Sequence, residues 1–70
     1  MIPLTMAAPG QTHCIRRITG RDDVRRRLSE LGFAVGSPVV VVTQAGGNLI
    51  LIVRDTRVAL GRDMANRIMV

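Results

Sequence analysis

Two short apolar runs with a glycine-rich turn between them limit what this chain can fold into more than any other feature. The first, "PVVVVTQ", begins at Pro38, and the second, "LILIV", occupies Leu49–Val53 after the turn "AGGN". Branched apolar residues on both sides of such a turn predict an antiparallel hairpin. Proline suits only the first residue of a strand, because it has no backbone N–H to donate. Both runs fall far short of the ~20 apolar residues that span a bilayer, so we expect no membrane span.

The second run has no polar residue to mark a solvent-facing side. In a small barrel only one face of each strand points into the core, so one of two sets of side chains needs other cover. The two sets are Leu49, Leu51 and Val53, and Ile50 with Ile52. A helix or another protein would supply that cover.

Further short elements are expected on both sides of the hairpin. Thr12–Ile18 is typical of a first strand with one wet face. Ile15 and Ile18 are three residues apart, which predicts a bulge or a strand end near Arg16 and Arg17. After the turn "RDT" come a short strand "RVALG", a helical half-turn "RDMAN" and a last strand "RIMV".

The segment "RDDVRRRLSEL" has helical periodicity, because Val24, Leu28 and Leu31 fall on one stripe. We expect Asp22 or Asp23 to cap its start, where free backbone N–H groups favour a carboxylate.

The same helix has a predicted end. Gly32 supplies a residue for the left-handed conformation, and Phe33 beyond it can fold back onto Leu28. The sequence therefore predicts a mainly β fold. It has about five strands closing as a small barrel, one α-helix between the first two strands and a short helical turn before the last. We expect residues 1–70 to form a single domain with a small core.

The chain is basic, with ten arginines against five acidic residues and a net charge of +5. Such a balance favours an acidic partner, whether nucleic acid, an anionic membrane surface or an acidic protein. Three helical pairs at i and i+4 are expected to balance most of the helix charge. The pairs are Asp22 with Arg26, Asp23 with Arg27, and Arg26 with Glu30. This balance, together with a single aromatic residue, disfavours nucleic-acid binding.

Arg21 and Arg25 have no paired acid in this scheme, so a partner of the helix would be expected to contact them first. The candidate partner-binding residues lie on the helix and on the second apolar run: Arg21, Arg25, Arg26, Glu30, Ile50 and Ile52.

Metal-binding and catalytic patterns are weak. His13 and Cys14 are adjacent, but neighbours on a strand point to opposite faces, so we expect a surface histidine and a buried cysteine. One histidine cannot build a catalytic triad, and no phosphate-binding loop is present, so we expect neither an enzyme nor a cofactor. A single cysteine excludes a disulfide within the chain, and "MIPLTMAAPG" does not resemble a signal peptide, which together favour the cytoplasm.

The segments "RRRLSELGFAVGSPVVVV" and "VALGRDMANRIMV" resemble the ferrous iron transport protein A (FeoA) family, and together they span most of the chain. The residues that carry the resemblance are Leu31, Gly32, Phe33, Gly36, Ser37, Ala65, Ile68 and Val70.

The resemblance implies an SH3-like barrel and a small non-enzymatic accessory of bacterial ferrous iron transport. Its implied partner is the cytoplasmic G-protein domain of the membrane ferrous iron permease, which would bring a cytoplasmic protein to the inner membrane. The family is also loosely associated with transition-metal binding, for which His13 and Cys14 are the weak candidates here.

Two other functions stay open at this point. One is a regulatory module similar to the SH3-like C-terminal domain of iron-dependent repressors. That domain normally follows other domains, whereas Met1 precedes the first expected strand by only eleven residues. The other is a small nucleic-acid-binding barrel, which charge alone favours. A homo-oligomer also stays open.

Overall fold

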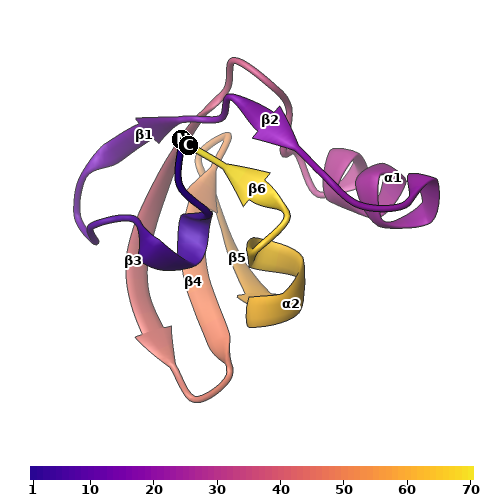
Figure 1. Ribbon diagram of the computed structural model, residues 1–70. Helices are drawn as coiled ribbons and strands as arrows, with labels where there is room; N and C mark the ends of the chain where they lie inside the picture. The colour runs from indigo at the N-terminus through magenta and orange to yellow at the C-terminus, as the bar shows by residue number, and fades with distance from the viewer.

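A four-stranded antiparallel sheet forms the frame of the molecule, and the computed structural model describes all 70 residues (Figure 1). The sheet order is β1-β3-β4-β5, and its strands are β1 (Thr12–Cys14), β3 (Pro38–Ala45), β4 (Asn48–Val53) and β5 (Thr56–Gly61). A second, two-stranded sheet pairs β2 (Arg17–Ile18) with β6 (Ile68–Met69). The helices are the 3₁₀-helix η1 (Leu4–Met6), α1 (Asp22–Glu30) and α2 (Arg62–Ala65). The expected mainly β fold, with one longer helix and a short helix before the last strand, is confirmed.

The predicted first strand is two strands, because the chain changes sheets at Ile15. The Ile15 N–H donates to the Ser37 carbonyl at 3.0 Å, whereas the next N–H, of Arg16, donates to the Met69 carbonyl at 2.8 Å. The expected strand end near Arg16 and Arg17 is therefore confirmed. Ile15 is fully buried at this corner, so one residue links both sheets to the core.

The start of α1 differs from the prediction. Arg21 precedes the helix with an extended backbone and makes no side-chain hydrogen bond to it. Asp22 and Asp23 are the first two helical residues rather than the cap, so the expected capping hydrogen bond is wrong. Their carboxylates still lie at the positive end of the helix dipole, which favours negative charge there.

The end of α1 is as expected. Gly32 has φ 103°, and its N–H donates to the Ser29 carbonyl at 3.0 Å. The Phe33 N–H donates to the Leu28 carbonyl at 3.0 Å, and both side chains are buried in one core. These two hydrogen bonds define a Schellman motif, which turns the chain away from the helix and toward β3.

The predicted hairpin pairs β3 with β4, and Gly46 and Gly47 form a two-residue turn between Ala45 and Asn48. Only Gly46 has a left-handed φ, of 61°, as the first central residue of a type II′ turn requires. The register shifts between Val41 and Thr43, which marks a bulge and increases the twist of the hairpin.

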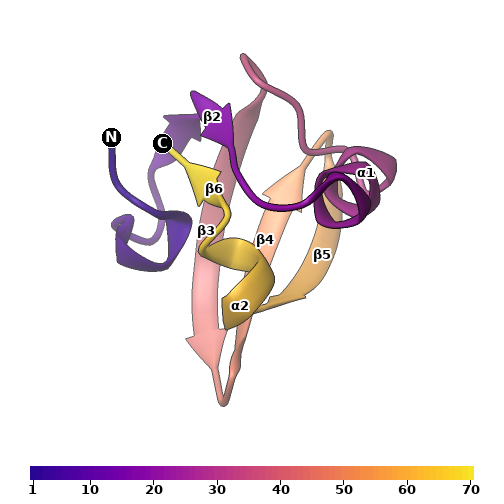
Figure 2. The same ribbon diagram turned by 45° about the vertical axis from the view of Figure 1, so that its right-hand side comes forward.

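The core lies on the inner face of the sheet, over which α2 and the β2–β6 pair are seen in Figure 2, and η1 packs against α2. Helix α1 lies beside the end of β4 and the start of β5 in the same view. Leu49, Leu51 and Val53 are at most 1% exposed, so they form the inner set of the two that the sequence left open. Thirteen buried apolar residues make up the core: Leu4, Ala7, Ile15, Leu28, Phe33, Val39, Val41, Leu49, Leu51, Val53, Leu60, Ala65 and Ile68.

The N-terminal segment is part of this core, which the sequence did not predict. Leu4 in η1 is fully buried, and the Thr5 hydroxyl donates to the Asn66 side-chain oxygen at 2.6 Å. Ile2 and Val70 exchange two backbone hydrogen bonds of 2.9 and 2.8 Å, so the two ends of the chain lie side by side (Figure 1). None of the helices has the length and apolar character needed to cross a membrane.

Candidate functional site

The outer face of the four-stranded sheet carries apolar side chains that no other element packs into the core. Residues opposite one another in neighbouring strands share a face, so the register identifies the rows of side chains on this side. Ile50 and Ile52 are half-buried here, and each is flanked by exposed neighbours on β5. The outer rows are Cys14 with Pro38; Thr12, Val40, Ile52 and Arg57; and Thr43, Ile50 and Ala59.

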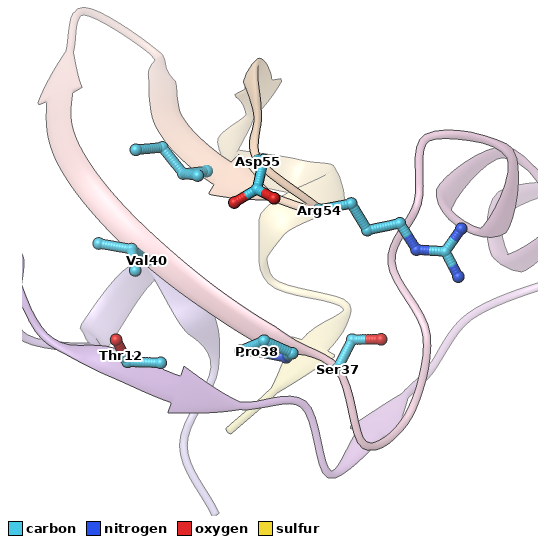
Figure 3. Close-up of a pocket in the computed structure, with 7 residues that line it drawn as sticks. Thr12, Ser37, Pro38, Val40, Arg54 and Asp55 are labelled. Carbon is cyan, nitrogen blue, oxygen red and sulfur yellow. The ribbon is translucent and has the colours of Figure 1, made fainter.

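A hollow of about 470 Å³ lies on this face, between β1 and the turn that joins β4 to β5 (Figure 3). Its apolar part consists of Pro38, Val40 and Ile52, which lie in adjacent strands. The hollow is partly open to solvent, and this shape suits a protein surface better than an enclosed small-molecule site. The complete lining is Thr12, Ser37, Pro38, Val40, Ile52, Arg54 and Asp55.

The turn at the edge of the hollow has an uncommon backbone. Arg54 and Asp55 have φ values of 52° and 61°, so both central residues are left-handed, as in a type I′ turn. Such turns favour Asn-Gly, because a Cβ crowds the backbone in this conformation. The Asp55 carboxylate points toward the hollow in Figure 3, whereas the Arg54 side chain extends the other way, toward α1. A Cβ built on Gly32 would lie 3.4 Å from the Arg54 Cδ, which places this arginine beside the end of α1.

The ion pairs of α1 are not the predicted ones. The Arg25 guanidinium lies 3.0 Å from the Asp22 carboxylate, and the Arg21 guanidinium lies 3.9 Å from that of Asp23. The three expected i to i+4 pairs are absent, so the statement that Arg21 and Arg25 lack a paired acid is wrong. The arginines without an ion pair on this helix are Arg26 and Arg27, and Glu30 also has none. All of these side chains are exposed.

The structure brings together only some of the candidate partner-binding residues. Ile52 lines the hollow, and Ile50 follows it in the next outer row. Arg25, Arg26 and Glu30 lie on α1, and Arg21 directly precedes it; all four are outside the lining of the hollow.

Sequence reasoning missed Arg54 and Asp55 as site residues. The sequence does contain a sign that this turn is unusual. "RDT" joins two expected strands, yet it contains neither glycine nor asparagine, the residues that tight turns favour.

The cysteine of the adjacent histidine and cysteine pair is not in its expected environment. Cys14 is exposed on the outer face opposite Pro38, so the prediction of a buried cysteine is wrong. His13 points to the other face opposite Val39, is half-buried, and its Nε2 lies 3.1 Å from the Ala8 carbonyl oxygen. His13 is therefore a partly exposed residue at the surface, as predicted. No three histidine, cysteine or acidic side chains lie close enough together to hold a metal ion.

Comparison with known proteins relates the whole chain to one family. The FeoA domain family matches residues 2–70. A protein of Methanocaldococcus jannaschii, provisionally named Fe(2+) transport protein A, is 30% identical over 70 residues, which cover all of this chain and 85% of that protein.

Solved structures share the fold. A crystal structure described as the iron uptake regulatory protein FeoA has a TM-score of 0.87 at 29% identity, over 97% of this chain and 90% of that one. The FeoA of Stenotrophomonas maltophilia, solved with zinc and described as an SH3 domain protein, has a TM-score of 0.84 at 28% identity, over 99% of this chain and 88% of that one.

A manganese-dependent transcriptional repressor is also similar, with a TM-score of 0.86 at 22% identity. The match covers 94% of this chain but only 38% of the repressor, and at this identity it establishes a common fold and nothing more. The family match over residues 2–70 and the two FeoA structures at 29% and 28% identity establish the family as well as the fold. The chain belongs to the FeoA family, whose members are non-enzymatic accessory proteins with an SH3-like fold, associated with ferrous iron transport.

Proposed function

We propose that this protein is a cytoplasmic accessory that binds the cytoplasmic part of the membrane ferrous iron permease and supports or regulates Fe(II) uptake. The observation that carries the proposal is the family match over residues 2–70. The uncovered apolar face of the sheet supports it, because a protein partner would remove Ile50, Ile52 and Val40 from water.

The outer face is the stronger of the two candidate contact surfaces. Arg21 and Arg25, which the helical spacing leaves without an acid, each have a carboxylate within 4 Å in the structure. These pairs are exposed, with 89% of the Arg21 side chain accessible, so they are weak and a partner can still replace them. Arg26 and Glu30 keep their charges free of ion pairs. The helix face therefore serves as a secondary contact that steers association.

The proposal does not require a metal ion held by this chain. Metal ions in proteins are held by clustered nitrogen, sulfur or carboxylate donors, and His13 and Cys14 project to opposite faces of β1 without a third donor nearby. These residues do not fit a metal site. Iron is the cargo of the transport system, and this protein acts on the permease rather than on the ion.

The direct test is isothermal titration of the full chain into the cytoplasmic domain of the permease, with and without guanine nucleotide and Fe(II). We expect saturable binding, which Ile52→Ser weakens more than Arg26→Ser does. Ile52→Ser removes an apolar contact, whereas Arg26→Ser removes an exposed charge. No binding at high micromolar concentration, together with normal iron uptake in a deletion strain, would contradict the proposal.

A gel shift with short RNA and DNA separates this function from nucleic-acid binding. Phosphate contacts release counterions, so a true nucleic-acid complex must weaken steeply as salt rises. We expect no shift at physiological salt. A salt-sensitive shift there, combined with no binding to the permease domain, would favour the basic-barrel alternative.

A further inference from the structure

One arginine and one aspartate line the hollow, and only the aspartate side chain points into it. The chain has a net charge of +5, yet the charged group that points into the hollow is the Asp55 carboxylate, since Arg54 extends toward α1 (Figure 3). Neither residue takes part in an ion pair within the chain, although ten arginines are available. The negative charge of Asp55 therefore has no internal partner, and a cation from outside can pair with it.

Apolar and hydroxyl groups share the lining of the hollow with this carboxylate. Val40 and Ile52 are cross-strand neighbours and form an apolar floor, and Thr12 extends the same row on β1. A ligand that fits must therefore present an apolar group and a cation close together. A lysine or arginine side chain next to an aliphatic one in an extended segment has this chemistry.

The turn backbone gives a second, independent reason to assign a role to this pair. Arg54 and Asp55 both hold a left-handed φ, which Asn-Gly would adopt with less strain. A strained turn that carries two charged side chains at the edge of a hollow is more readily explained by recognition than by folding.

A protein segment fits the hollow better than the alternative occupants. A nucleic acid or an anionic lipid would bring phosphate groups against the Asp55 carboxylate, and like charges repel. A second copy of the chain would bring a net charge of +5 toward a protein that itself has a net charge of +5. A partner that places one basic side chain beside the Asp55 carboxylate avoids both the repulsion between phosphate and carboxylate and the repulsion between two copies of a basic protein.

We propose that the hollow binds an extended segment of the permease's cytoplasmic part, with a lysine or arginine paired to Asp55 and an adjacent aliphatic side chain on Val40 and Ile52. This inference rests on the proposed function and adds the contact site and its chemistry. Asp55 determines specificity, and the Arg54–Asp55 turn holds its carboxylate in place.

The test compares Asp55→Asn with Asp63→Asn in the titration against the permease domain. Asparagine accepts the left-handed conformation, so Asp55→Asn keeps the turn and removes only the charge. Asp63 lies on α2, is exposed and has no ion pair, so its variant changes the net charge equally at another place. We expect Asp55→Asn to weaken binding tenfold or more, and Asp63→Asn to change it less than twofold.

Cys14 provides a footprint of the same surface. It is exposed, is the single cysteine of the chain, and lies opposite Pro38, which lines the hollow. In the wild-type chain, we expect a saturating concentration of the permease domain to slow alkylation of Cys14 by iodoacetamide several-fold. In the Asp55→Asn variant, the same concentration of the domain should slow this reaction much less.

The outcomes separate the inference from the function on which it rests. If the wild-type chain binds the permease domain and both variants bind equally well, the inference is overturned and the proposed function stands. No wild-type binding would overturn both. Self-association in sedimentation that depends on Asp55 would assign the hollow to a second copy and overturn the inference.

Discussion

Gly32 ends α1 because it adopts a φ of 103°, which a residue with a Cβ rarely adopts. The neighbouring charges are much less constrained. Asp22 has two arginines within helical reach, at i+3 and i+4, and the sequence pattern alone favours the second. The side chain of Arg25 takes the i+3 pair instead. Exposed pairs of this kind differ by a few tenths of a kcal/mol, so their choice of partner cannot be predicted from spacing, whereas the glycine position can.

Gly32→Ala tests the backbone requirement directly. A Cβ at this position meets only the flexible Arg54 side chain at 3.4 Å, so the cost comes from the backbone conformation rather than from a clash. We expect the free energy of unfolding in urea to fall by about 1–2 kcal/mol. Gly47→Ala is the matched control, because Gly47 has no left-handed φ and no atom within 4 Å of its built Cβ, and it should change stability by less than about 0.5 kcal/mol. Equal effects of the two substitutions would contradict the expectation.

At the scale of elements, the β3–β4 and β4–β5 hairpins use different turns and were predicted with different success. "AGGN" identifies its own turn, because glycine accepts the left-handed first position that a type II′ turn requires. "RDT" was recognised as a turn, but its type was not, since arginine is an uncommon left-handed residue. The site residues Arg54 and Asp55 were missed for the same reason. A left-handed arginine departs from the sequence preferences by which turn types are predicted.

Replacing Arg54 by asparagine should relieve the strain of this turn. Asparagine is favoured at the first central position of type I′ turns, so we expect Arg54→Asn to raise the free energy of unfolding by about 1 kcal/mol. For a domain of this size that corresponds to a rise in Tm of about 4–8 °C, measured by circular dichroism. Asp55 is retained, so the direct contact that we propose at the hollow is kept.

Arg57→Asn is the control for this variant, because it removes the same charge from an exposed position within β5. Asparagine is a poor strand residue, so this substitution should leave Tm unchanged or lower it. If Arg54→Asn also lowers Tm, the turn is not strained, and the packing of Arg54 beside α1 contributes more than its backbone costs.

At the scale of the whole molecule, the first and last residues of the chain close the structure. The η1 segment contributes Leu4 to the core and bonds to the α2 end through Thr5 and Asn66, while Ile2 and Val70 join the termini. Sequence periodicity could not predict this, because three helical residues between Pro3 and Pro9 are too few to have a period. Helix α1 and the strands β3, β4 and β5, which are longer and have clear boundaries, were predicted within a few residues.

The expectation that residues 1–70 form a single domain leads to a prediction about cooperativity. Leu4 is fully buried, so Leu4→Ala should lower the free energy of unfolding by about 3 kcal/mol, a large fraction of the total for a chain this small. Because the chain has neither tryptophan nor tyrosine, unfolding is best followed by far-ultraviolet circular dichroism and by amide NMR signals of β4. Both probes should move to lower urea together, with an unchanged m-value.

Met6→Ala is the matched control for Leu4→Ala, since Met6 lies in the same 3₁₀-helix but is 69% exposed. It should shift the midpoint by less than about 0.5 kcal/mol in equivalent free energy. If Leu4→Ala instead loosened only the N-terminal segment, the amide signals of β4 would keep their wild-type midpoint. The N-terminal segment would then be an appendage to the barrel rather than part of its single cooperative unit.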